Sequence, residues 1–226
     1  MSLTPETLAR QIDHTLLHPT ATAVEIDQLC AEAIELDCYS VCVATSRVDQ
    51  AVARTEDSDV RVCAVVGFPL GNSESDSKRY ETEMAVDLGA HEIDVVLNLG
   101  MVKDGADDSV FRELRDVVEA ADERPVKLIL ETGYLDEGEI RRVVEIFKRT
   151  GGHFVKTSTG FGPRGATVAD VRLLRELVGP GYGVKASGGI RDAAGAVEMI
   201  EAGANRLGMS ATVQVLQELR DSEFES

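Results

Sequence analysis

The stretch GGHFVKTSTGFGPRGATVADVRLLRELVGPGYGVKASGG, residues 151–189, contains the pattern on which the fold prediction depends. An apolar run at 153–158 is followed by a helical pattern, which Thr167 and Asp170 open as an Asp variant of a capping box. A second apolar run follows at 183–186. A strand, a helix and a further strand in succession predict one parallel βαβ unit.

The same alternation extends through the rest of the chain. Helical patterns, such as Ile26, Leu29, Cys30 and Ala33, separate most of the short β-branched or apolar runs. These runs lie at 12–16, 40–44, 62–68, 92–98, 126–131, 153–158, 183–186 and 206–209. Eight such units in a chain of 226 residues predict an α/β fold, a closed TIM (β/α)8 barrel. We expect a single domain over 1–226 with a short N-terminal helix, and the pattern leaves an open doubly wound sheet as the alternative.

The charge of the chain restricts its partners. The formal net charge is −17, which argues against nucleic acid and anionic membranes because both would repel this surface. Acidic residues number 40 against 23 basic ones, and lysine is scarce. We therefore also predict adaptation to high salt, where screening relieves the repulsion between acidic groups.

The compartment is predicted from the N-terminus and the cysteines. The first ten residues lack the charged and then apolar layout of a signal peptide. The four cysteines, Cys30, Cys38, Cys42 and Cys63, show neither zinc-site nor disulfide spacing, so we expect buried free thiols. Both observations predict a cytoplasmic protein.

Two lysines lie within or at the ends of predicted strands, Lys156 in HFVKTSTG and Lys185 in GVKASGG. A single strand lysine usually extends to the surface or pairs with an acid. Two on consecutive strands, however, could bring their ammonium groups together. An amine with an ordinary pKa of about 10.4 becomes nucleophilic when a neighbouring cation and partial desolvation lower that pKa. We predict a Schiff-base nucleophile.

Asp94 interrupts an apolar strand in EIDVVL and should face the barrel interior with these lysines. It could shuttle protons, or it could serve only as a structural ion pair, since such pairs also perturb pKa values.

Glycines and hydroxyl residues follow the last three predicted strands. Backbone N–H groups at such positions can bind phosphate, and barrels often bind it after strands seven and eight. The positions that fit are Gly188, Gly189, Gly208 and Ser210. Ordinary turn glycines would explain any one of them alone.

Other chemistries have little support. Gly160, Gly162 and Gly165 form a Gly-x-Gly-x-x-Gly motif, but the next strand end carries Lys185 where a dinucleotide site places an acid. His14 and His18 lie at a strand end rather than on a helix, which disfavours a shared metal. No Gly-x-Ser-x-Gly elbow occurs. We expect neither a metal nor a cofactor.

Six segments together resemble deoxyribose-phosphate aldolase, in order from about Ile12 to Ser210. They are IDHTLL, SVCV, VVGFPLG, HEIDVV, FVKTSTG and GVKASGGI. The resemblance implies a metal-free TIM barrel that reversibly cleaves 2-deoxy-D-ribose 5-phosphate to D-glyceraldehyde 3-phosphate and acetaldehyde in deoxynucleoside breakdown. Dimers or tetramers are common among similar barrels, so we expect a homo-oligomer.

The resemblance also implies roles for individual residues. Lys156 would be the nucleophile, Lys185 the cation beside it, and Asp94 the proton relay acting with Lys185 through water. Asp13, Thr15, Cys42 and Thr159 would bind the sugar. Phosphate would be held by Gly160, Gly188, Gly189 and Ser210, with the following helix supplying its positive end.

Departures from the family pattern concern the rim of the predicted site. Ala44-Thr45 replaces a usual Asn-Pro, His18 stands where a lysine often precedes the proline, and Gly133-Tyr134 replaces a common Cys-Leu. These changes bear on substrate range. Two other functions remain open on the residues alone: another Schiff-base aldolase or transaldolase, and a barrel that only binds phosphorylated metabolites.

Overall fold

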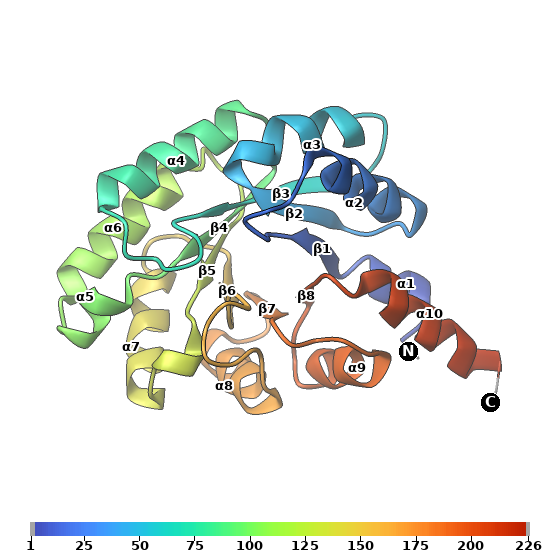
Figure 1. The fold of residues 1–226 in the computed structure, drawn as a ribbon. Helices are drawn as coiled ribbons and strands as arrows, with labels where there is room; N and C mark the ends of the chain where they lie inside the picture. Colours follow the sequence, from blue (N-terminus) through green and yellow to red (C-terminus); the bar gives the residue numbers. More distant parts are fainter. Residues whose placement is uncertain (1–2, 225–226) are drawn as a thin grey trace.

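A computed structural model describes residues 3–224 and confirms the predicted TIM barrel. Neighbouring strands are parallel, and the first pairs with the last, so the sheet is closed (Figure 1). The strands are β1 Ile12–Leu16, β2 Ser40–Ala44, β3 Arg61–Val66, β4 Glu92–Val96, β5 Val126–Ile129, β6 Phe154–Lys156, β7 Gly183–Ser187 and β8 Arg206–Met209.

Helices surround the barrel (Figure 1). They are α1 Pro5–Ala9, α2 Ala23–Glu35, α3 Val48–Thr55, α4 Ser75–Asp87, α5 Leu99–Lys103, α6 Asp107–Ala120, α7 Glu137–Lys148, α8 Val168–Val178, α9 Ala193–Glu201 and α10 Thr212–Phe224, with 3-10 turns at Thr45–Arg47 and Thr132–Tyr134. Thr4 caps the predicted N-terminal helix. Across residues 3–224, every helix is too short or too polar to cross a bilayer.

β3 stops at Val66, two residues short of the predicted run at 62–68. Three further predicted strands also end earlier in the structure than in the sequence pattern, and these three leave polar residues beyond their ends. β4 stops at Val96 because Asn98 caps α5, its side chain accepting a hydrogen bond from Met101 N–H. β5 stops at Ile129, and Glu131 beyond it adopts a left-handed conformation with φ 53°. β6 keeps only Phe154–Lys156. Each of these three shortenings places polar residues in loops at the C-terminal rim.

The barrel strands separate an apolar layer from a polar one. Outward-facing residues such as Val41, Ile93, Leu128 and Val184 are buried in the main hydrophobic core. The inward-facing positions of the same strands carry charged and polar side chains, which are also buried: Asp13, Ser40, Glu92, Asp94, Lys127, Lys156, Lys185 and Arg206. Barrel interiors are usually filled by branched apolar residues, so this interior is unusually charged.

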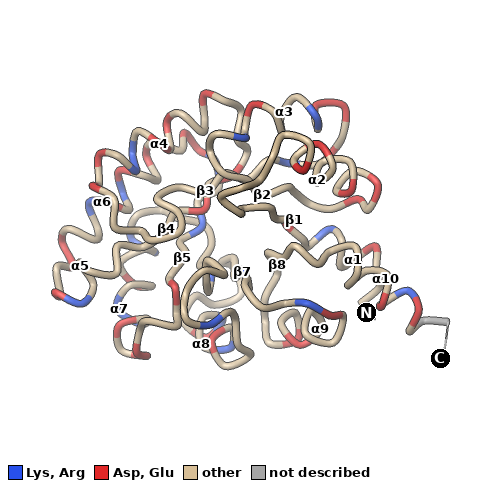
Figure 2. Tube along the Cα trace, in the orientation of Figure 1, with Lys and Arg blue, Asp and Glu red and all other residues tan. Residues whose placement is uncertain are grey.

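Acidic residues occur on helices all around the barrel (Figure 2). Several of them form exposed ion pairs with arginine, such as Arg54 with Asp27 and Arg141 with Glu137. Exposed pairs of this kind contribute about 0–1 kcal/mol each to stability. These exposed ion pairs therefore stabilise the fold little, and the folding free energy comes mainly from the apolar layer.

Candidate active site

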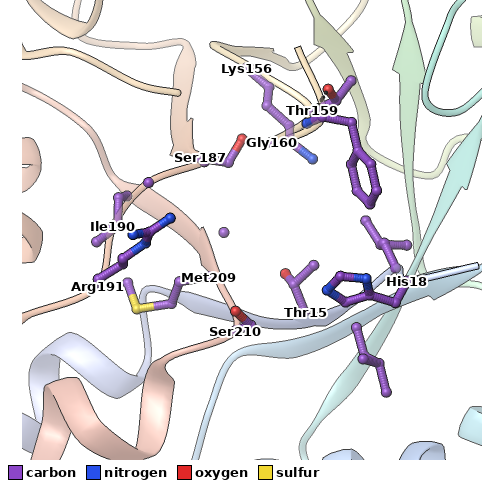
Figure 3. A pocket seen from close by; sticks show the side chains of 16 residues that line it. Thr15, His18, Lys156, Thr159, Gly160, Ser187, Ile190, Arg191, Met209 and Ser210 are labelled. Atoms are coloured by element: carbon purple, nitrogen blue, oxygen red, sulfur yellow. Dashed lines mark hydrogen bonds between the residues drawn. The ribbon is translucent and has the colours of Figure 1, made fainter. Parts of the chain in front are cut away.

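A pocket of about 430 Å³ opens at the C-terminal ends of the strands. Lys156 extends its amine into it, with Ser187 and Gly160 close by and Thr15, His18 and Ser210 across the opening (Figure 3). The lining residues are Thr15–His18, Lys156, Thr159–Phe161, Ser187–Arg191 and Gly208–Ser210. They lie at or directly after the C-terminal ends of β1, β6, β7 and β8, the end of a barrel where substrates bind.

Lys156 and Lys185 are paired in register on β6 and β7, and one carboxylate joins them. The Nζ atoms of both lysines lie 2.8 Å from Oδ2 of Asp94. The structure thus brings together the three residues that the sequence selected. From the sequence we expected the positive charge of Lys185 to repel that of Lys156. The carboxylate of Asp94 lies between the two amines and offsets this repulsion.

A third lysine, Lys127, belongs to the same cluster and was missed. Its Nζ donates to Oδ1 of Asp94 at 2.7 Å, contacts Glu92 Oε2 at 2.7 Å, and lies 3.3 Å from the Cys63 sulfur. A signal was present in the sequence, because Lys127 alternates with Val126 and Leu128 as Asp94 does with its neighbours. Lys127 fixes one oxygen of Asp94 so that the other faces Lys156 and Lys185.

Arg206 supports this cluster from the N-terminal side of the barrel. Its Nη1 donates to Asp13 Oδ1 at 2.8 Å and to Glu92 Oε2 at 3.0 Å. The guanidinium carbon lies 3.4 Å from the centre of the Tyr39 ring, a cation–π contact. Asp13 also accepts a hydrogen bond from Lys185. Arg206, Glu92 and Tyr39 were not selected from the sequence.

Burial and mutual contact set the charges in the cluster. Burial would raise the pKa of Asp94, but Lys127, Lys156 and Lys185 hold that pKa well below its usual range. Burial would lower the pKa of Lys185, but Asp13 and Asp94 raise it above the usual range. These shifts favour the ionised form of Asp94 and the protonated form of Lys185 in the resting cluster.

Two predicted sugar-binding residues lie outside the pocket wall. Asp13 and Cys42 are completely buried, Asp13 against Lys185 and Arg206, and Cys42 beside Cys63 on the neighbouring strand. A hydrogen bond from Cys63, opposed by burial and assisted by Lys185, lowers the pKa of Cys42 to about 7. Thr15 and Thr159 do line the pocket.

The predicted phosphate residues Gly160, Gly188, Gly189 and Ser210 all line the pocket. Arg191 lines it as well and was missed, although it directly follows the Gly-Gly-Ile segment. The start of α9 differs from expectation: Asp192 accepts from Gly195 N–H at 2.7 Å, and Glu218 accepts from Ala193 N–H at 2.9 Å. The backbone N–H groups that we expected to bind phosphate therefore already donate hydrogen bonds to carboxylates.

Groups of acids and thiols that could hold a metal lie inside the barrel. Within residues 3–224, the sets close enough together are Cys42, Cys63 and Asp94, and Asp13, Cys63 and Glu92. Lysine or arginine already contacts every carboxylate in these sets. All four cysteines are free and buried, as expected.

Comparison with known proteins identifies similar sequences and structures. Residues 7–218 match the model of the DeoC/LacD family of aldolases. The chain is 52% identical over 214 residues to the deoxyribose-phosphate aldolase of Caldanaerobacter subterraneus subsp. tengcongensis, covering 93% of each protein. It superposes with a TM-score of 0.92 on the aldolase QR15, at 39% identity over 96% of this chain and 98% of the other. The tetrameric deoxyribose phosphate aldolase of Aeropyrum pernix gives a TM-score of 0.91, at 35% identity over 97% and 93%.

Proposed function

This chain belongs to the DeoC/LacD family of aldolases, and we propose that it reversibly cleaves 2-deoxy-D-ribose 5-phosphate to D-glyceraldehyde 3-phosphate and acetaldehyde through a Schiff base on Lys156. The observation that carries this proposal is the position of one amine. Lys156 lines the pocket, while its Nζ is held 2.8 Å from a buried carboxylate. Relatives about half identical over 93% of the chain are named for this activity.

The contacts of the three lysines favour Lys156 as the nucleophile. Lys127 and Lys185 are fully buried, and each contacts a second carboxylate besides Asp94. Among the described residues, Asp94 is the one carboxylate that forms an ion pair with Lys156. Asp94 can accept the proton that Lys156 releases before attack, and Lys185 keeps that carboxylate ionised.

The reaction then uses the imine as an electron sink. The amine adds to the C1 aldehyde, water leaves, and the C2–C3 bond breaks with its electrons moving into the enamine. The C3 hydroxyl proton leaves through the relay of Asp94, Lys185 and water, which later returns a proton to C2. Hydrolysis of the remaining imine releases acetaldehyde and restores Lys156.

Binding would orient the sugar between two ends of the pocket. Gly160, Gly188, Gly189, Ser210 and the guanidinium of Arg191 would hold the phosphate. Thr15 would contact the sugar. The aldehyde end would then reach Lys156.

Other properties of the enzyme are also proposed. A homo-oligomer is supported by the tetramer of the Aeropyrum pernix relative. A reducing, cytoplasmic location fits the four free cysteines. A role in carbohydrate degradation follows from the substrate. Adaptation to salt fits the charge of −17, and an unfolding midpoint that falls as KCl rises to molar concentration would contradict it.

A substrate panel tests the activity. Acetaldehyde release from 2-deoxy-D-ribose 5-phosphate should be measured by a coupled reduction, beside fructose 6-phosphate and fructose 1,6-bisphosphate. Turnover of the deoxy sugar phosphate supports the proposal. Turnover of a ketose phosphate in its place would indicate another Schiff-base aldolase or transaldolase, and tight phosphate-ester binding without turnover would indicate a binding protein.

A further inference from the structure

Glu131, which lies outside the lysine cluster, has two features that lower the stability of a folded protein. It is a non-glycine residue in the left-handed region, at φ 53° and ψ 60°, and its side chain is 3% exposed. Among the described residues, its Oε1 atom is buried without a hydrogen-bond partner. Left-handed backbone and buried unpaired oxygens both destabilise a fold and are commonly retained at functional sites.

The paired oxygen of Glu131 holds a loop that lines the pocket. Oε2 accepts from the backbone N–H of Thr159 at 3.1 Å and also from the Thr159 hydroxyl. The same hydroxyl oxygen accepts from Phe161 N–H at 3.0 Å. Glu131 and Thr159 therefore fix the turn that holds Gly160, with φ 87°, between Thr159 and Phe161.

This turn closes tightly over the Glu131 carboxylate. A Cβ atom at Gly162 would lie 2.6 Å from the Glu131 carboxyl carbon, so a larger residue there would displace this carboxylate. Thr132, the next residue, holds the far side of the loop, because its carbonyl accepts from Arg164, which also pairs with Asp170. The loop is thus anchored twice to the end of β5.

The anchored loop supports the Gly-Gly segment after β7. A Cβ at Gly188 would lie 3.1 Å from the Cα atoms of both Gly160 and Gly165, and one at Gly165 would lie 2.1 Å from the Gly188 carbonyl oxygen. Ala166 N–H donates to the carbonyls of Ser187 at 3.1 Å and Gly188 at 3.0 Å. The two loops are in backbone contact, so the position of one fixes the other.

We propose that Glu131 is a positioning residue for phosphate recognition: through Thr159 it sets the turn at Gly160, against which Gly188 is held, and Gly189 follows Gly188 directly in the chain. The proposal rests on the function proposed above, because it assumes a phosphorylated substrate in this pocket. The Thr159 hydroxyl donates its hydrogen to Glu131, so under this proposal that hydroxyl holds the turn rather than binding the substrate. Glu131 itself would not touch substrate.

The test compares KM values for 2-deoxy-D-ribose 5-phosphate and for 2-deoxy-D-ribose. Glu131→Ala should raise the KM for the phosphorylated sugar by about tenfold to a hundredfold, as expected for one lost charge-assisted hydrogen bond, and change the other KM much less. Thr159→Val should cause the same selective loss. Glu131→Gln keeps an acceptor oxygen and should stay closer to wild type than to Glu131→Ala. Glu145→Ala, an exposed carboxylate on α7, is the matched control and should retain both wild-type KM values.

Several outcomes would overturn the proposal. Glu131→Ala with wild-type KM values, or with equal losses on both sugars, would mean that the residue is unimportant or merely structural. If Glu131→Ala does not fold, Thr159→Val with an unchanged ratio of the two KM values would decide against it. If wild type fails to turn over the phosphorylated sugar, the proposed function fails instead. Calorimetric titration with inorganic phosphate then still tests Glu131, which should weaken phosphate binding when replaced by alanine.

Discussion

Replacing Lys127 with methionine tests whether the buried charge cluster acts as a unit. The substitution keeps the unbranched stem but removes an ammonium held 2.7 Å from both Asp94 and Glu92. Each carboxylate keeps other partners: Asp94 keeps Lys156 and Lys185, and Glu92 keeps a contact with Arg206 at 3.0 Å. The loss should therefore lie near the lower end of the range for a broken buried ion pair, about 3 kcal/mol.

For a chain of this length that loss lowers Tm by roughly 6–12 °C. Asp94 would also lose the contact that fixes Oδ1, so the geometry of Oδ2 at the two amines should loosen. Turnover should fall by about tenfold or more, because small misplacements of reacting groups are costly.

Thermal unfolding and steady-state turnover measure both effects, with Lys148→Met on the exposed face of α7 as the matched control. The control should resemble wild type in both assays. A Lys127→Met protein with wild-type Tm and turnover would refute the view that Lys127 supports Asp94.

The remaining predictions concern pH, phosphate and metals. Lysines hold the pKa of Asp94 well below its usual range in spite of burial, so its stabilising contribution is complete above the unfolded pKa of about 3.9 and is lost as pH falls through the folded pKa. The urea midpoint of unfolding should therefore fall through the protonation of Asp94 only below about pH 4, and Asp94→Asn should make this fall with pH less steep. An equally steep fall in Asp94→Asn would contradict the prediction. Ser210→Asp places a like charge against the ester and should weaken binding of the phosphorylated sugar by about 1.5–3 kcal/mol, with much less effect on 2-deoxy-D-ribose; equal damage to both would place the phosphate elsewhere. Chelators at constant ionic strength should leave turnover intact, and a loss restored by one specific divalent ion would disprove the metal-free mechanism.

Most of the fold could be predicted because a parallel barrel repeats one local pattern. Each strand carries an apolar outward face that must pack under helices, so the runs at 40–44 and 206–209 matched β2 and β8. Strand ends were less predictable. Glu131 continues an apolar run in sequence, yet its conformation is set by contacts to Thr159, a residue on another loop.

The central residues of the site could be predicted because charges within apolar strands are conspicuous. The alternation of Lys127 with its apolar neighbours indicates an inward-facing strand position, but a single strand lysine usually extends to the surface or pairs with an acid, so the local sequence does not mark it as part of a site. The contacts of Asp13 with Lys185 and Arg206 depend on closure of the barrel between β1 and β8, which no local pattern specifies. The carboxylates at the start of α9 depend likewise on Glu218 from the following helix.

The identity of the nucleophile is the central claim, and trapping tests it most directly. Wild-type protein should be incubated with 2-deoxy-D-ribose 5-phosphate or acetaldehyde, reduced with borohydride, digested and mapped by mass spectrometry. We predict a stable adduct on the peptide containing Lys156, with a two-carbon mass when acetaldehyde is used, and no adduct in Lys156→Leu. An adduct located mainly on Lys185 or Lys127, or trapping that persists in Lys156→Leu, would contradict the assignment.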